Sequence, residues 1–217
     1  LNMKYPIYIL ILLLTLTSCE KLLEEQPFTE TATEFFYETK EDALSSLTAA
    51  YARLKSGNGY YRQKFISSVF AASDQGQANF VYGDFKRGTI VNTDQNLPAT
   101  WREIYVGVRD ANNVIAHVPG IDMDVELRAR IIGEAKFLRA LHYFNLVRCW
   151  GEVPLRTEPV GPDDEGLPVS PITDIYEVII SDLQDASANC WGRLAHRNGE
   201  TNDLGRVTKA AAHALLA

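Results

Sequence analysis

One long apolar segment, which follows Asp122 or Asp124 and stops at Gly151, constrains the fold most strongly. Its apolar residues cover most of the circumference of a helix: Leu127, Ile131, Ile132, Ala135, Phe137, Leu138, Leu141, Phe144, Leu146 and Val147. Such a helix must have neighbours on several sides. An aspartate can cap its first turn, and a glycine favours its end. The sequence therefore predicts a central helix that runs to about Trp150.

Four further segments show helical periodicity, near residues 40–56, 98–118, 171–190 and 208–217. The first follows Thr39-Lys-Glu-Asp42, which resembles a capping box with Asp in place of Glu. Pro98 suits the first position of the second helix, and Thr208 can cap the last. A short apolar run, Phe65 to Ala72, fits either a helix or a strand. With almost no convincing strand elsewhere, we expect a mainly α fold of paired antiparallel helices.

The first residues have the features of an export signal. Lys4 precedes an apolar stretch from Ile7 to Leu16, which would form a helix of about 15 Å, half the thickness of a ~30 Å hydrocarbon layer. Leu16-Thr-Ser-Cys19 then resembles a bacterial lipoprotein signal, in which the cysteine becomes the acylated N-terminus. We expect a signal peptide at 1–18 and a lipidated arm at 19–40. The alternative is an ordinary signal peptide with an incidental cysteine.

Composition and motifs exclude several classes of function. The net charge of −7 with no basic block argues against a nucleic-acid binder. No nucleophile elbow, zinc-protease motif or phosphate loop is present, so we expect no enzyme activity, cofactor or metal. Three cysteines are too few for a disulfide scaffold; Cys149 and Cys190 could pair, but two small buried side chains are favoured. The helix from Val207 to Ala217 stops while still apolar, which suggests a longer protein.

Four motifs in order resemble the SusD/RagB family of Bacteroidetes outer-membrane lipoproteins. They are the hallmark stretch Gly133–Leu155 (GEAKFLRALHYFNLVRCWGEVPL), Trp101-Arg-Glu-Ile-Tyr105 with Asn112-Asn113, Ile175–Leu183, and Gly205–Ala217 (GRVTKAAAHALLA). The resemblance implies a SusD-like helical fold with tetratricopeptide-like helix pairs over residues 41–217, of which only the N-terminal part is present. It also implies that the hallmark stretch carries the fold rather than a ligand site.

The resemblance further implies a function at the cell surface. Members of this family are anchored by lipid to the outer membrane, where they capture oligosaccharides, or peptides in some members. They deliver this cargo to a TonB-dependent SusC-like barrel transporter. A second interpretation is a helix-pair scaffold that binds only proteins or peptides. A third, a surface glycosidase, needs two facing carboxylates, for which Asp74, Asp84 and Asp94 are the candidates.

The loop-rich stretch 73–96 has the residue types that bind sugars, and the resemblance implies that part of the ligand site lies here. Aromatic rings pack on the apolar faces of sugars, and polar side chains bond their hydroxyls. The candidate ligand-binding residues are Asp74, Gln75, Asn79, Tyr82 and Arg87. The alternative is that Phe80, Tyr82 and Phe85 only pack the loop onto the helices.

Other conspicuous residues favour structural roles. His142 and Trp101 lie on apolar helical faces and are expected in the core. Glu134 has Lys136, Arg139 and Arg148 near it in the same helix, which favours structural ion pairing. Trp191, in a polar link that contains glycine, is a weaker candidate for an exposed ligand contact.

Overall fold

The computed structural model describes residues 36–55, 60–77, 82–91, 93–94, 96–161, 166–192 and 205–217, without the side chains of Tyr60 and Arg62. Its helices are α3 (Lys40–Lys55), η2 (Tyr60–Lys64, a π-helix), α4 (Phe65–Ala72), α5 (Gly83–Arg87), α6 (Asn96–His117), η4 (Val118–Gly120), α7 (Val125–Trp150), α8 (Ile172–Asn189) and α9 (Lys209–Leu216). Two short strands, β1 (Val153–Pro154) and β2 (Val169–Ser170), pair antiparallel. The mainly α prediction is confirmed.

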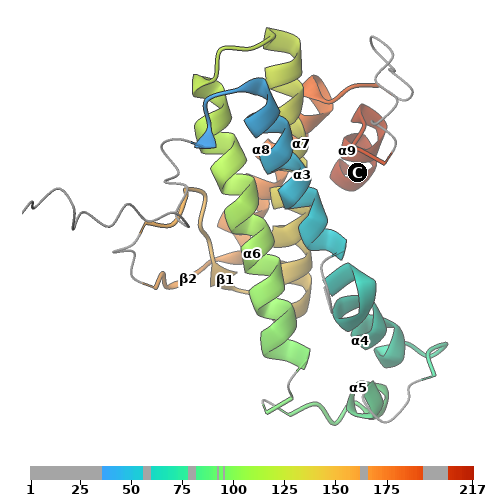
Figure 1. Cartoon of the computed structure of the whole chain (residues 1–217). Coiled ribbons are helices and arrows are strands. Elements are labelled where there is room, and N and C mark those ends of the chain that lie inside the picture. The colour runs from blue at the N-terminus through green and yellow to red at the C-terminus, as the bar shows by residue number, and fades with distance from the viewer. Residues whose placement is uncertain are drawn as a thin grey trace, which may run out of the picture. The chain divides into compact units, whose positions relative to one another are not determined.

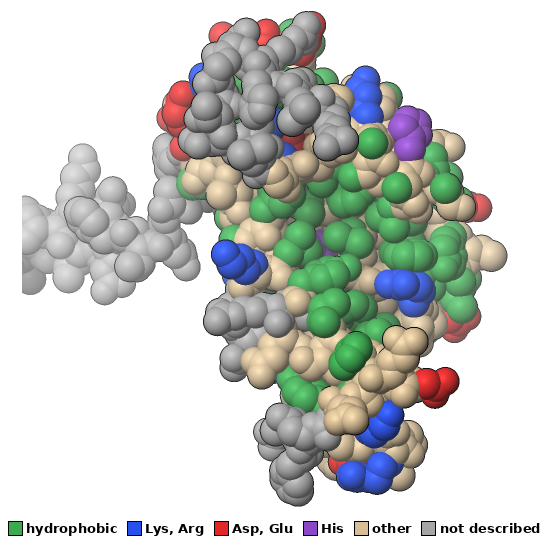
Figure 2. All heavy atoms as spheres, turned by 90° about the vertical axis from the view of Figure 1, so that its right-hand side faces the viewer, with side chains coloured by type: hydrophobic (Ala, Val, Ile, Leu, Met, Phe, Trp, Pro, Cys, Tyr) green, Lys and Arg blue, Asp and Glu red, His purple; other side chains and the backbone are tan. Residues whose placement is uncertain are grey.

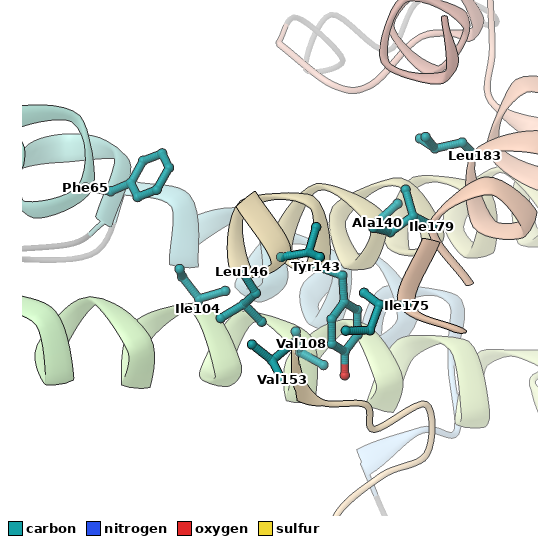
Figure 3. Close-up of a cluster of buried hydrophobic side chains, with 11 residues drawn as sticks. Phe65, Ile104, Val108, Ala140, Tyr143, Leu146, Val153, Ile175, Ile179 and Leu183 are labelled. Atoms are coloured by element: carbon teal, nitrogen blue, oxygen red, sulfur yellow. The ribbon is translucent and has the colours of Figure 1, made fainter. Parts of the chain in front are cut away.

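The central helix is confirmed as α7, which packs against α3, α6 and α8. Consecutive long helices alternate in direction, so that α6–α7 and α7–α8 form antiparallel pairs (Figure 1). Side chains of all three helices meet in the main hydrophobic cluster, which includes Ile104, Val108, Tyr143, Leu146 and Ile175 (Figure 3). A second cluster joins α3 to the N-terminal half of α7. The two antiparallel pairs, α6–α7 and α7–α8, therefore share α7 as their central helix.

Three predicted helix caps are confirmed. The Asp42 carboxylate accepts from the Thr39 amide at 2.9 Å, and the Asp42 amide donates to the Thr39 hydroxyl at 3.2 Å, which is a reciprocal capping box. Asp124, rather than Asp122, accepts from the Leu127 amide at 2.8 Å. Thr208 accepts from the Ala211 amide at 3.2 Å. Each cap satisfies an amide that the first turn of a helix leaves without an intrahelical partner.

The start of α6 differs from the prediction. The helix begins at Asn96, so Pro98 is its third residue rather than its first. Asp94 causes the shift, because its carboxylate accepts from the amides of Asn96 at 2.7 Å and Leu97 at 3.3 Å. Proline is tolerated at the third position, since no amide of the first turn has an intrahelical acceptor. The stretch 73–96, which was expected to be rich in loops, also contains the short helix α5.

Tyrosines fix the extended chain that follows α7. The Tyr105 hydroxyl donates to the Pro154 carbonyl at 2.7 Å. The Tyr143 hydroxyl donates to the Arg156 carbonyl at 2.8 Å and accepts from the Arg156 amide at 2.7 Å. Burial raises the pKa of Tyr143 to about 12, so this hydroxyl keeps its proton. The β1–β2 pair, which periodicity did not reveal, is thus held by α6 and α7.

A buried guanidinium connects three helices to this extended chain. Arg139 on α7 donates to both carboxylate oxygens of Asp182 on α8, at 2.7 and 2.8 Å. It also donates to the Asn112 side-chain oxygen on α6 and to the Thr157 carbonyl, both at 2.9 Å. Asn112 donates in turn to the carbonyls of Arg156 and Glu158. The Arg139 and Asp182 side chains are only 8% and 4% exposed, so these protein partners replace most of the hydration that both charges lose on folding.

A second buried charge anchors the segment before α9. Glu134 is fully buried, and its carboxylate accepts from Arg130 at 2.6 Å, from the Tyr51 hydroxyl at 2.6 Å and from Arg206 at 3.4 Å. The Tyr51 hydroxyl also accepts from the Val207 amide at 2.9 Å. Structural ion pairing of Glu134 is therefore confirmed, but the partners differ from those expected. Lys136, Arg139 and Arg148 point to other groups: Asp185, Asp182 and Asn145.

Other residue-level predictions had mixed outcomes. Cys190 is buried and Cys149 is exposed, and both are free thiols, so they do not pair and only Cys190 is a buried side chain. Cys149 lies in the last turn of α7, where its side chain is exposed. Trp101 is half-buried at the rim of the main cluster, edge-on to Trp150 with ring centroids 5.4 Å apart. The predicted signal peptide, Cys19 and most of the arm lie outside the described residues.

The core prediction for His142 is confirmed, and a glycine on α6 makes room for the ring. A side-chain carbon at Gly107 would lie 2.3 Å from His142 Nε2, so α6 and α7 approach closely only because this position is glycine. The imidazole is fully buried, and desolvation lowers its pKa to about 3. The histidine is therefore neutral in the folded protein over the physiological pH range.

We expect this burial to make folding stability depend on pH. In the unfolded chain the His142 pKa is near its ordinary value of about 6.5, so between pH 6.5 and 3 only the unfolded state binds the proton. Because of this residue alone, the free energy of unfolding should decrease by about 1 kcal/mol for each unit by which the pH is lowered near pH 5.5. Urea unfolding at pH 7.0 and 5.5 measures how steeply the free energy of unfolding depends on pH. The substitution His142→Gln should reduce this dependence by about 1 kcal/mol per pH unit. The matched control is His213→Gln, at an exposed position on α9. An unchanged slope in His142→Gln would contradict the expectation.

Candidate functional site

The candidate residues Asp74 and Gln75 lie in a tight turn directly after α4. Ser73 builds the turn, because its amide and hydroxyl both donate to the Phe70 carbonyl, at 3.1 and 2.7 Å. The Gly76 amide then donates to the Ser73 carbonyl at 3.2 Å. A side-chain carbon at Gly76 would lie 1.8 Å from the Phe70 carbonyl oxygen, so the turn needs glycine there. Both candidate side chains are exposed at the tip of this turn.

Tyr82 and Phe85 pack into the protein. Their rings lie 6.4 Å apart in a small cluster with Ala71 of α4 and Leu97 of α6. Tyr82 is only 8% exposed, so its ring offers no open face to a sugar in this structure. The packing alternative therefore holds for both aromatic residues. Asn79 and Phe80 lie outside the described residues.

Arg87 ends the short helix α5 with its side chain 64% exposed. Its Nη2 donates to the Asp84 carboxylate at 2.6 Å, and Thr89 donates to the same oxygen at 3.2 Å. Gly88 follows with a positive φ of 66°, which allows the chain to turn away from the helix. The ion pair with Asp84 holds one edge of the Arg87 guanidinium. The remaining N–H groups of this exposed side chain can donate to an acceptor outside the protein.

The structure thus brings three of the candidates onto one packed unit. Because α4 packs against α5 through the Tyr82–Phe85 cluster, the Asp74–Gln75 turn and Arg87 belong to the same small unit. Together they offer a carboxylate, an amide and a guanidinium to solvent, the groups that bond hydroxyls. The carboxylates of Asp84 and Asp94 have structural partners instead, the former in the Arg87 ion pair and the latter at the α6 cap.

Two polar pockets lie outside the stretch that the sequence singled out. One, of about 490 Å³, is lined by Lys136, Arg139, Leu155, Thr157, Asp174, Glu177, Val178, Ser181 and Asp182. The other, of about 400 Å³, is bordered by Glu126, Asn189, Trp191 and Lys209 among others. Trp191 is half-buried, with the Arg130 guanidinium 3.9 Å from its ring centroid. Sequence reasoning missed the first pocket because its walls come from three separate segments, and no local pattern marks such a site.

The part of the chain that the structure describes has neither a metal-binding cluster nor a membrane-spanning helix. It contains no cluster of three or more His, Cys, Asp or Glu side chains able to hold a metal ion. None of its helices is long and apolar enough to cross a membrane.

Comparisons with known proteins agree on one family. Residues 21–217 match a SusD-like family model described as starch-binding and associating with the outer membrane. Among curated relatives, SusD-like protein P38 of Formosa agariphila is 31% identical, and the match covers 87% of this chain and 37% of that protein. The chain therefore spans less than half the length of this relative.

Solved structures give the same result. A laminarin-binding SusD-like protein is 29% identical, with a TM-score of 0.70 over 83% of this chain and 39% of its own. A SusD homologue from Bacteroides thetaiotaomicron superposes with a TM-score of 0.73 at 24% identity, over 87% of this chain and 37% of its own. At this low identity, the likeness to the Bacteroides thetaiotaomicron homologue is evidence for a shared fold and not for a shared ligand. The fold over most of this chain is thus a fold found in solved SusD-like proteins.

Proposed function

The chain belongs to the SusD-like family, and from this premise we propose that it binds oligosaccharides or polysaccharides at the cell surface for uptake. It delivers them to a TonB-dependent SusC-like transporter in the outer membrane. The observation that carries the proposal is the family match over residues 21–217. The laminarin-binding relative, whose fold this chain shares, adds support for a carbohydrate as the ligand.

The exposed polar groups next to α4 and α5 suit this role. The Asp74 carboxylate accepts from sugar hydroxyls, and the Gln75 amide both accepts from them and donates to them. Arg87 donates to hydroxyl or ring oxygens. Each hydrogen bond that involves a charged group contributes about 1.5–3 kcal/mol. Asn79 is a further predicted contact in the same stretch.

The proposal includes an anchor at the other end of the chain. Acylation of Cys19 would hold the folded unit at the outer membrane, since each buried CH₂ of a lipid chain contributes about 0.8 kcal/mol. The family description, which names association with the outer membrane, supports this location. Binding and delivery need no chemistry on the sugar, so the protein acts without catalysis.

A second function, a scaffold that binds only proteins or peptides, is favoured by one observation. The outer face of α4 exposes Ile66, Val69 and Phe70, and exposed apolar clusters commonly mark protein contacts. The two functions differ in their dependence on sugar. A scaffold would associate with its barrel partner equally well in the presence or absence of glycan.

Loss of the Asp74–Gln75 turn should weaken glycan binding. Asp74→Ala with Gln75→Ala removes a charge-assisted and a neutral hydrogen bond, so the dissociation constant should rise at least tenfold. Affinity gels that contain starch or laminarin, followed by calorimetry, provide the measurement. Asp122→Ala, also at an exposed aspartate, is the matched control and should bind like the unaltered protein. Failure of the unaltered protein to bind any polysaccharide or oligosaccharide would refute the proposed function.

Replacing the acylated sulfur should release the protein from the envelope. Cys19→Ser retains the size and polarity of the side chain but cannot form the thioether to lipid. After fractionation, we expect the variant in the soluble fraction and the unaltered protein in the outer membrane. Equal retention of both in the membrane would show that residue 19 is not the anchor.

A further inference from the structure

The indole ring of Trp191 is held in place by a side chain of α7 and by the start of α9. The guanidinium of Arg130, on α7, lies 3.9 Å from the ring centroid. Arg130 is only 3% exposed and donates to the Glu134 carboxylate at 2.6 Å, so this cation is itself fixed. The Trp191 carbonyl accepts from the Lys209 amide at 3.1 Å. The ring is therefore positioned by the fold without a ligand.

The backbone that precedes this ring is anchored as well. Cys190 is fully buried and packs with Ala186 of α8 and Ala212 of α9. The end of α8 also lies close to α7, where a side-chain carbon at Gly133 would be 3.1 Å from the Asn189 Cβ. Glycine at this position allows the two helices to approach so closely. This packing fixes the end of α8, to which the ring is attached.

Trp191 is half-buried, and it lines the pocket of about 400 Å³ together with three polar side chains. These are Glu126 of α7, Asn189 of α8 and Lys209 of α9. A carboxylate accepts hydrogen bonds, an ammonium group donates them, and an amide does both. The volume lies within the range of small-molecule sites, about 300–1,000 Å³. The pocket therefore combines an aromatic ring with the groups that bond hydroxyls.

The charges that line the pocket balance. Glu126 and Lys209 have opposite charges. Burial raises the pKa of the Cys190 thiol, which also lines the pocket, to about 12, so this group is neutral. A pocket with one charge of each sign favours an uncharged ligand over an anion or a cation.

We propose that this pocket is a second carbohydrate-binding site, which takes one ring of an uncharged saccharide against Trp191. This inference rests on the proposed function, because it adds a contact for the same glycan. The apolar C–H face of a sugar packs on the indole, while its hydroxyls bond to Glu126, Asn189 and Lys209. Since the fold already orients the ring, little conformational freedom is lost on binding.

The surface around α9 is less suited to sugars outside this pocket. Figure 2 views the molecule from the side on which α4 and α9 lie in Figure 1, and hydrophobic side chains gather over its middle. A sugar hydroxyl that leaves water for such a surface loses hydrogen bonds that nothing replaces. The polar side chains of the pocket supply these bonds next to an aromatic ring. This contrast favours the pocket over the open apolar face.

The two candidate sites lie at opposite ends of the helix bundle. Glu126 is in the first turn of α7, and Figure 1 shows α5 at the other end of the bundle. Helix α7 has 26 residues and is therefore about 39 Å long. A glycan that reaches both sites binds the second one intramolecularly, so its affinity exceeds that of either site alone. The ligand class that fits both sites is thus a long, uncharged polysaccharide.

Binding measurements on the full-length protein test this site. Trp191→Ala should raise the dissociation constant for laminarin, starch or another neutral polysaccharide at least about fivefold. Trp191→Phe retains an aromatic ring and should raise it by less than about twofold. The matched control is Tyr176→Ala, which removes a 36% exposed ring from α8 outside the pocket and should bind like the unaltered protein. A smaller loss in Trp191→Ala, or an equal loss in Tyr176→Ala, would overturn the proposal.

Tryptophan emission separates a ligand contact from a purely structural role. A saccharide that packs on the indole should change the emission of the unaltered protein. This change should shrink by about half or more in Trp191→Phe, although that variant still binds. An equal change in both proteins, or no change in either, would assign Trp191 to packing against Arg130 alone and would overturn the proposal.

Affinity gels show whether the second site or the proposed function has failed. If neutral polysaccharides retain the unaltered protein but the Trp191 variants contradict the expectations, only the second site is lost. If only a charged polysaccharide such as alginate retains the protein, this inference is again overturned and the proposed function stands. If no polysaccharide or oligosaccharide binds, both proposals fail.

Discussion

The arrangement of the helices depends on a buried charge that must have partners. Removing an arginine side chain from water costs several kcal/mol unless hydrogen bonds and an opposite charge replace the lost hydration. Arg139 meets this requirement only when Asp182 of α8, Asn112 of α6 and the Thr157 carbonyl converge on it. Other packings of the same helices would leave the guanidinium buried without these partners. Hydrophobic contact favours burial, and this polar centre selects one arrangement.

Glu134, about one and a half turns before Arg139 on α7, is a second buried charge that must have hydrogen-bonded partners. Its carboxylate accepts hydrogen bonds from Tyr51 of α3 and from Arg206. These two residues are 155 positions apart in the sequence, and their shared bond to Glu134 makes them neighbours. The segment before α9 is held in this way, and α9 itself then packs against α8. The most motif-rich part of the sequence is thus structural. Candidate ligand contacts lie elsewhere, on short elements attached to this framework.

Local patterns were enough to predict the long helices and three of their caps. Thr39, Asp124 and Thr208 cap as expected because capping involves residues only two to four positions apart. The partners of Glu134 and the burial of Tyr82 depend on segments far apart in the chain, and no periodicity records them. The prediction that α6 begins at Pro98 was wrong for a related reason. The carboxylate of Asp94 accepts from the Asn96 amide, so the helix begins two residues earlier. The turn of Asp74 and Gln75 was identified by residue type, whereas its geometry comes from Ser73 and Gly76.

The role of Arg139 can be measured directly by a double-mutant cycle with Asp182. Arg139→Met and Asp182→Leu each leave one buried charge unpaired, so each should lower the free energy of unfolding by about 3–5 kcal/mol. The double variant removes both charges, and its loss should be smaller than the sum of the single losses by at least 2 kcal/mol. Urea unfolding at neutral pH gives all four values. Single variants within about 0.5 kcal/mol of the unaltered protein would show that this pair does not select the helix arrangement.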